Sequence, residues 1–296
     1  MTEAVAPAPR PGLARDLVTL GKPGITMMCA LMAAGAMYLA PTSPPPGRAL
    51  AILAALSLCV MAANALNMYL ERDGDRHMAR TRQRPLAAGR MRPGAVLAGG
   101  LVAGIASVAL LSWLANPLTG LLGLLSIVSY VWLYTPMKRR SWWALIVGAF
   151  PGAAPPLMGY TAATGRIDAV GLTLFLILLV WQIPHFIAIA LYRRADYERA
   201  GIRTLPSERG EDTAKVHALA WSLALVPVSL MLVPLGIAGF IYFLVASALG
   251  AWFFVFCLRG FEPQSGAVWA RRFFLATLAY LPLLVVGLVA DIWIPL

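Results

Sequence analysis

A run of 43 consecutive residues, from 216 to 258, contains no aspartate, glutamate, lysine or arginine. A helix that crosses the hydrocarbon core of a bilayer needs about 20 apolar residues, so this run is far too long for one crossing and long enough for two. We therefore expect a hairpin of two membrane-spanning helices that turns between Pro234 and Gly239. The whole chain is 60% hydrophobic and 12% charged, whereas soluble domains carry about 25% charged residues. A polytopic membrane protein is the class that fits this composition.

Segments rich in proline, glycine or charge divide the rest of the chain into further apolar stretches. They predict an all-α polytopic membrane protein in which nine transmembrane helices form a bundle. The bundle makes a single domain over residues 17–296, and a polar, proline-rich tail at residues 1–16 is expected to be disordered and cytoplasmic. The nine predicted helices cover residues 18–40, 49–70, 94–115, 117–135, 142–162, 170–192, 215–235, 237–258 and 272–294.

The basic residues predict how this bundle is oriented. When the N-terminus is placed in the cytoplasm, 22 of the 24 lysines and arginines fall in cytoplasmic segments, and Arg48 and Arg166 fall outside. Cytoplasmic loops of membrane proteins carry such an excess, so we expect the N-terminus inside and the C-terminus outside. The net charge of +11 then reflects topology, and the expected surroundings are a lipid bilayer rather than nucleic acid.

Eight of the thirteen carboxylates lie in two cytoplasmic segments, which we call the first charged loop (residues 71–93) and the second charged loop (residues 193–214). Asn67, Glu71 and Asp75 are spaced four residues apart, so they share one face if the preceding helix continues through them. Two carboxylates and an amide oxygen suit Mg²⁺, which binds through one or two carboxylates together with substrate phosphates. Neighbouring arginines can bind phosphate oxygens through both guanidinium nitrogens. The pattern predicts a site for the diphosphate of a lipid-tailed substrate, and the solvated ion pairs of an ordinary loop are the alternative.

The residues that begin at Asn67 resemble the signature of the UbiA family of intramembrane prenyltransferases. The matching residues are Asn67, Glu71, Asp75, Met78, Arg80, Thr81, Arg84 and Gly89. The sequence YTPMKR supplies the family's Tyr-x-x-x-Lys as Tyr134 and Lys138. The stretch WQIPHFIAIALYRRADYERAGIRTLP, together with KPGIT at residues 22–26, resembles the branch of that family that makes heme O.

Three positions depart from the family pattern. Glu71 stands where aspartate is commoner and carries its carboxylate on a longer arm. Ala200 follows Asp196 by four residues, where many relatives have a second aspartate, and Gly74 replaces a position that is usually apolar.

The resemblance implies a UbiA-like bundle around a central cavity, in a bacterial cytoplasmic membrane. It implies transfer of a farnesyl group from farnesyl diphosphate to a vinyl group of heme b, with Mg²⁺ as cofactor. Heme A synthase or oxidase assembly proteins are candidate partners. The expected metal ligands are Asn67, Glu71, Asp75 and Asp196; the diphosphate contacts are Arg80, Arg84, Lys138 and Arg194; the catalytic residues are Tyr134 and Lys138; and the heme contacts are His185 and His217.

Two other classes of function remain open on the sequence. A relative that prenylates an aromatic acid or a quinone precursor would share the metal and diphosphate residues but not the stretch that begins WQIPHF. A transporter or a non-catalytic assembly factor would place its polar groups near the bilayer midplane, whereas these carboxylates gather at one membrane face. His185 lies inside a predicted span beside Pro184, and an ionisable residue at such a depth favours a functional role.

Overall fold

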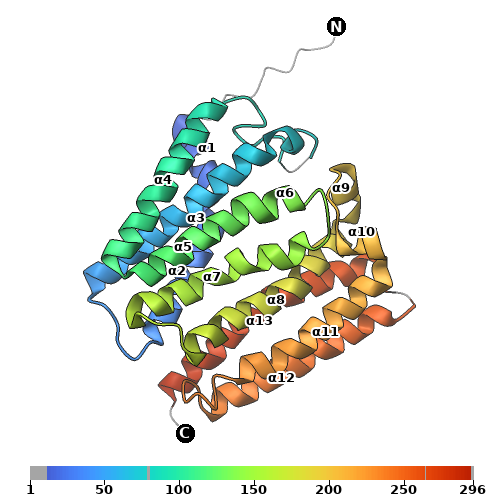
Figure 1. Cartoon of the computed structure of the whole chain (residues 1–296). Helices are drawn as coiled ribbons and strands as arrows, with labels where there is room; N and C mark the ends of the chain where they lie inside the picture. Colours follow the sequence, from blue (N-terminus) through green and yellow to red (C-terminus); the bar gives the residue numbers. More distant parts are fainter. Residues whose placement is uncertain (1–11, 79–80, 264, 295–296) are drawn as a thin grey trace.

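The computed structural model describes residues 12–78, 81–263 and 265–294, and within them the chain forms helices and no strand. The long helices run side by side, and the short helices α9 and α10 lie at the end of the bundle that also carries the loop after α3 (Figure 1). The first part of the chain forms α1 (Leu13–Gly21), α2 (Pro23–Tyr38), α3 (Pro46–Asp75), α4 (Pro93–Leu114), α5 (Pro117–Val128), the π-helical turn η1 (Ser129–Tyr134), α6 (Thr135–Met137) and α7 (Ala144–Thr164). The second part forms α8 (Ala169–Tyr192), α9 (Arg194–Arg199), α10 (Leu205–Arg209), α11 (Glu211–Leu230), α12 (Phe240–Leu258), the 3₁₀ turn η2 (Arg259–Phe261) and α13 (Ala267–Trp293).

Prolines fix where several of these helices begin. α2, α3, α4 and α5 each start with proline at the first helical position. The first N–H groups of a helix have no partner within it, so proline loses nothing there and its fixed φ suits the helix. The prolines that separate the apolar stretches in the sequence are therefore also the residues that start the helices.

The number of membrane spans differs from the prediction. Seven helices are long and apolar enough to cross a membrane, and an eighth crossing results if α1 and α2, which meet at a 46° bend, count as one span. Nine spans are therefore not confirmed. The predicted segment 142–162 does form α7, but its three internal prolines, Pro151, Pro155 and Pro156, lower its apolar character. The hairpin predicted within residues 216–258 is confirmed, because α11 and α12 are separated by residues 231–239.

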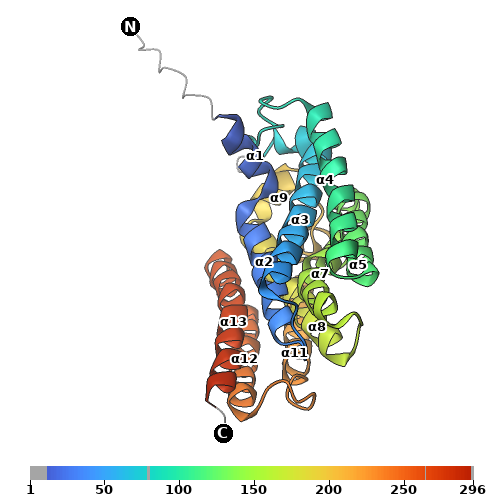
Figure 2. The same ribbon diagram turned by 90° about the vertical axis from the view of Figure 1, so that its left-hand side faces the viewer.

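Two apolar cores meet along α7 and α8. One core joins α2, α3, α5 and α7, and the other joins α8 with α11, α12 and α13. Figure 2 shows α12 and α13 as a layer beside the helices of the first part. The close approach of α2 to α7 needs a glycine, since a Cβ atom at Gly159 would lie 2.1 Å from the backbone oxygen of Ala33. Small residues allow such backbone contact between membrane helices.

Part of the segment predicted as an N-terminal tail, residues 1–16, is helical. Residues 1–11 lie outside the described part of the chain, whereas Leu13 to Asp16 form the first turn of α1. Asp16 is buried, and its Oδ1 lies 2.8 Å from Nη2 of Arg90 in the first charged loop. This ion pair joins α1 to the loop. α1 begins at Leu13, which is before residue 17, the predicted start of the domain.

Candidate active site

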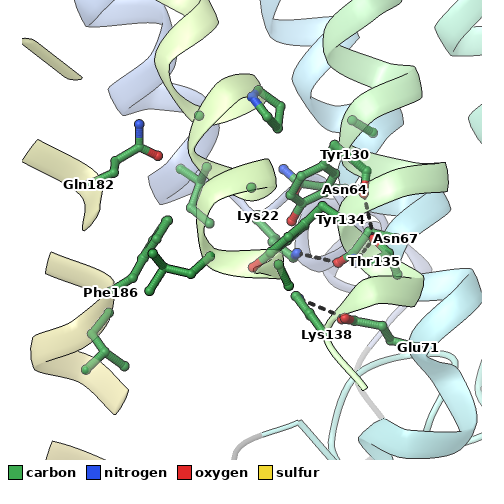
Figure 3. Close-up of a pocket in the computed structure, with 18 of the residues that line it drawn as sticks. Lys22, Asn64, Asn67, Glu71, Tyr130, Tyr134, Thr135, Lys138, Gln182 and Phe186 are labelled. Carbon is green, nitrogen blue, oxygen red and sulfur yellow. Dashed lines mark hydrogen bonds and ion pairs between the residues drawn. The ribbon is translucent and has the colours of Figure 1, made fainter. Parts of the chain in front are cut away.

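α3 continues unbroken to Asp75, five residues beyond the predicted helix end. Asn67, Glu71 and Asp75 consequently face the same cavity, as their spacing predicts. The cavity has a volume of about 760 Å³ and is lined by α2, α3, η1, α7 and α8 (Figure 3). This volume lies within the roughly 300–1,000 Å³ of pockets that bind organic ligands.

Two of the three carboxylates of α3, Glu71 and Asp75, pair with cationic side chains inside the cavity. Glu71 Oε1 lies 2.8 Å from Nζ of Lys138, and Asp75 Oδ2 lies 2.7 Å from Nη1 of Arg84. The same Arg84 nitrogen is 3.8 Å from Glu71 Oε2, so one guanidinium contacts both acids. These four side chains are between 5% and 21% exposed, whereas Asp73, which points away from this face, is 71% exposed. The pairs at the site are therefore not the solvated ion pairs of an ordinary loop.

Asn67 brings Lys22 into the site. Nζ of Lys22 donates to Oδ1 of Asn67 at 3.0 Å, and Nδ2 of Asn67 donates to the hydroxyl of Thr135 at 3.0 Å. Lys22 lies at the bend between α1 and α2 with a φ of 48°, the one positive φ of a non-glycine residue in the described ranges. A left-handed conformation of this kind costs about 1–2 kcal/mol and is often retained at functional sites. The sequence did not identify Lys22 as a site residue, although a lysine before a proline at the start of an apolar stretch was visible.

The π-helical turn η1 places two tyrosines beside Lys138. The ammonium of Lys138 lies 4.4 Å from the ring centroid of Tyr134, and the ring centroids of Tyr130 and Tyr134 are 5.3 Å apart. The hydroxyl of Thr135 donates to the backbone oxygen of Tyr130 at 2.7 Å, and π-helical turns occur frequently at functional sites. Tyr134 and Lys138 meet as the sequence predicts. Tyr130, four residues before Tyr134, also lines the cavity and was not included in the predicted site.

The second charged loop does not join this cluster through the predicted residues. Asp196 pairs with Arg193 and Arg199, and Arg194 pairs with Glu198 at 2.8 Å. Neither Asp196 nor Arg194 is among the cavity-lining residues; from the same segment Tyr197 and Arg203 line it instead. No group of three or more His, Cys, Asp or Glu residues is placed to hold a metal in the ranges that the structure describes. The predicted phosphate ligand Arg80 lies outside those ranges.

The two predicted heme contacts are placed differently. His185 lines the cavity, stacks on Trp181 and lies with Nδ1 2.7 Å from the hydroxyl of Thr277. His217 is not among the lining residues, and its ring contacts Trp142, which does line the cavity, with centroids 5.6 Å apart. His185 is therefore the histidine that a molecule in the cavity can reach.

Comparisons with known proteins identify the family to which the chain belongs. The model of the UbiA prenyltransferase family matches residues 26–278. A protein of Anaeromyxobacter sp. (strain Fw109-5) named protoheme IX farnesyltransferase is 48% identical over 93% of each chain. A protein of Myxococcus xanthus with the same name is 43% identical over 95% of this chain and 96% of its own.

Solved structures share the fold. A structure described as digeranylgeranylglyceryl phosphate synthase has a TM-score of 0.82 at 14% identity and covers 94% of this chain and 98% of its own. A UbiA homologue from Archaeoglobus fulgidus bound to GPP and Mg²⁺ has a TM-score of 0.68 at 14% identity, covering 93% of this chain and 99% of its own. Because the family match and the relatives span nearly the whole sequence, this chain is a multispan membrane protein that belongs to the UbiA prenyltransferase family.

Proposed function

We propose that this protein transfers the farnesyl group of farnesyl diphosphate to a vinyl group of heme b, producing heme O. The observation that carries the proposal is the name protoheme IX farnesyltransferase on relatives that are 43–48% identical over almost the entire chain. In this reaction the bond between the farnesyl carbon and the diphosphate oxygen breaks, and that carbon bonds to the vinyl group. Water supplies the hydroxyl group of the product and releases a proton, and diphosphate leaves.

The charged end of the cavity is suited to the diphosphate. Loss of diphosphate from an allylic carbon builds negative charge on the leaving oxygens, and cations aimed at those oxygens lower the barrier. Arg84 and Lys138 line this end, and Lys22 adds a third cation whose contact there is the neutral amide oxygen of Asn67. We assign these three side chains to the diphosphate. The assignments of Arg80 and Arg194 remain predictions.

The oxygen donors of α3 fit a magnesium ion. Asn67, Glu71 and Asp75 present an amide oxygen and two carboxylates to one cavity, which is the hard, all-oxygen donor set that Mg²⁺ prefers. When bound, the ion would neutralise charge on the diphosphate oxygens. Asp196 remains a predicted ligand whose present partners are arginines of its own segment.

Aromatic rings next to the cations suit the allylic cation that remains after diphosphate leaves. The ring of Tyr134 already receives the ammonium of Lys138 at 4.4 Å, and ring faces attract positive charge. Another part of the cavity wall carries apolar side chains such as Met32, Met158 and Phe186, together with His185. We assign this wall to the farnesyl tail and the porphyrin, with His185 as the heme contact.

The proposed orientation follows the charge. Arg48 and Arg166 are the two basic residues that fall outside the predicted cytoplasmic segments. Arg48 donates to the backbone oxygen of Leu114, and Arg166 lies in the loop between α7 and α8. Both positions are at the end of the bundle opposite the charged loops (Figure 1). The charged end would then face the cytoplasm.

The test is expression in cells that make only heme b, followed by extraction and chromatography of the hemes. We expect a farnesylated heme with the mass of heme O. Folded, abundant protein in the membrane without that product would contradict the proposal.

A further inference from the structure

His185 is an ionisable residue inside a membrane helix, and its ring is fixed from several sides. It stacks on Trp181 with centroids 4.7 Å apart and an interplanar angle of 16°, and Phe274 of α13 lies 5.4 Å away. Trp181 is itself held, because its Nε1–H donates to the backbone oxygen of Thr277 at 2.9 Å. The imidazole therefore has little freedom to turn, and its hydrogen bond decides which nitrogen faces the cavity.

The hydroxyl of Thr277 determines which nitrogen of His185 carries the hydrogen. Oγ1 of Thr277 lies 2.6 Å from the backbone oxygen of Phe274 and 2.7 Å from Nδ1 of His185. Two oxygens at this distance are held together by a hydrogen between them, so the single hydroxyl hydrogen is donated to Phe274. Nδ1 must then donate its own hydrogen to Oγ1, which leaves the lone pair of the neutral ring on Nε2.

Nε2 of His185 is open to the cavity. Nδ1 makes the ring's one hydrogen bond within the described part of the chain. In that same part, every fully buried side-chain nitrogen or oxygen has a hydrogen-bond partner. Since Nε2 has none, it is accessible rather than fully buried. His185 lines the cavity, and a neutral Nε2 that faces a cavity can ligate a transition metal.

We propose that Thr277 is a positioning residue that fixes His185 as the Nδ1–H tautomer and thereby presents Nε2 as a ligand of the heme iron. This inference rests on the proposed function, in which heme is the acceptor. Ligation would hold the porphyrin against α8 and keep its vinyl group at one place relative to the diphosphate end. Histidine ligands commonly donate the other ring N–H to an oxygen, and removing that oxygen typically costs 10–100-fold in metal affinity.

The test titrates ferric heme b into the purified full-length protein in detergent, without prenyl diphosphate, and follows the Soret absorption band. We expect a band shift in the wild type, its loss in His185→Ala, and its recovery when imidazole is added to that variant. Thr277→Val, which lacks the hydroxyl, should raise the Kd for heme by roughly 10–100-fold, and Thr277→Ser should bind like the wild type. Thr173→Val is the matched control, because this α8 threonine is also buried but donates to Ala169.

Two results would overturn the inference. A wild-type band in His185→Ala would exclude ligation, and equal affinities of Thr277→Val and Thr173→Val, with equal thermal unfolding, would exclude the positioning role. Thr277→Cys, whose sulfur is a weak acceptor, gives the same comparison if valine prevents folding. Either result in a protein that still makes heme O leaves the proposed function intact, whereas a wild type that ligates heme but never farnesylates it overturns the proposed function alone.

Discussion

The two charged loops contain similar residues but fold differently. Both combine carboxylates with arginines, and both contain an Arg-Thr pair before a proline. In the first, the side chains of Glu71 and Asp75 are 21% and 5% exposed and face the cavity. In the second, those of Asp196 and Glu198 are 39% and 49% exposed and lie outside the cavity wall.

The continuity of the preceding helix explains the difference. α3 passes through its acidic residues without a break, so residues four apart stay on the cavity face. α8 ends at Tyr192, and Arg193, with φ of −107° and ψ of 23°, separates it from α9. The acids of α9 then pair with arginines three or four residues away. Composition therefore identifies a charged segment, but the continuity of the preceding helix decides whether the carboxylates of that segment face the cavity.

The energetic contrast follows from burial. Exposed ion pairs such as those of α9 contribute about 0–1 kcal/mol each. Removing one partner of a buried pair leaves an uncompensated charge and can cost about 3–5 kcal/mol. The pairs of Glu71 with Lys138 and of Asp75 with Arg84 are mostly buried, so the free energy lost on removing one partner should be nearer the value for a buried pair.

The largest effect on activity is predicted for a substitution of Asp75 in the first charged loop, and the same substitution of Asp196 in the second charged loop is the comparison. Asp75→Asn should reduce heme O formation by roughly 10²–10³-fold, the scale on which a group that stabilises transition-state charge acts, while insertion into the membrane is unchanged. Asp196→Asn should retain activity within a few-fold, because its partners are arginines of its own segment. Heme chromatography at equal protein levels measures both. Equal losses in the two variants would mean that the second loop also reaches the substrate, and the contrast between the loops would be wrong.

A smaller effect is predicted for Lys22. Lys22→Met should raise the KM for farnesyl diphosphate about tenfold, because a hydrogen bond to a charged group contributes about 1.5–3 kcal/mol, while leaving the Kd for heme unchanged. Lys215→Met is the control, since this lysine is buried whereas Lys22 is partly buried, and it pairs with Glu211 and does not line the cavity. Steady-state kinetics in detergent separate the two. A KM that is unchanged in Lys22→Met would remove Lys22 from the diphosphate site.

The length of the Glu71 side chain gives a finer test of the first loop. Glu71→Asp shortens the arm that reaches Lys138 at 2.8 Å, so we expect the Mg²⁺ concentration at half-maximal rate to rise a few-fold without loss of the maximal rate. Titration of the rate with Mg²⁺ measures this shift. Activity of the wild type after complete removal of divalent cations would contradict the magnesium assignment itself.

Local sequence pattern predicted those features that depend on a single helix. The hairpin of α11 and α12, the shared face of Asn67, Glu71 and Asp75, and the meeting of Tyr134 with Lys138 one turn later all follow from spacing along one segment. The contact of Lys22 with Asn67 joins residues 45 apart, which periodicity does not encode. The π-helical turn of residues 129–134 and the break at Arg193 are departures from regular helix geometry. Sequence reasoning that assumes regular helices therefore misses them.

The smallest predicted effect lies at the opposite end of the molecule from both charged loops. Asp168 caps α8, since its side chain accepts from the backbone N–H groups of Val170 and Gly171, and it also accepts from the hydroxyl of Tyr160. Burial alone would raise the pKa of this carboxyl, but these hydrogen bonds and Arg166 outweigh it and hold the pKa below its ordinary value of 3.8. A lowered pKa stabilises the folded state above pH 3.8, and this contribution is lost as the pH falls below that value.

Asp168→Ala should therefore destabilise the protein by about 1 kcal/mol at neutral pH, the usual cost of losing an N-terminal cap. Its farnesyl transfer at low temperature should equal that of the wild type, because the cap is remote from the cavity's charged end. Thermal unfolding in detergent at pH 7 and near pH 3 measures the effect, and the gap between variant and wild type should narrow in acid. A loss of activity as large as that of Asp75→Asn would mean that the end of the bundle away from the charged loops also sets the geometry of the site.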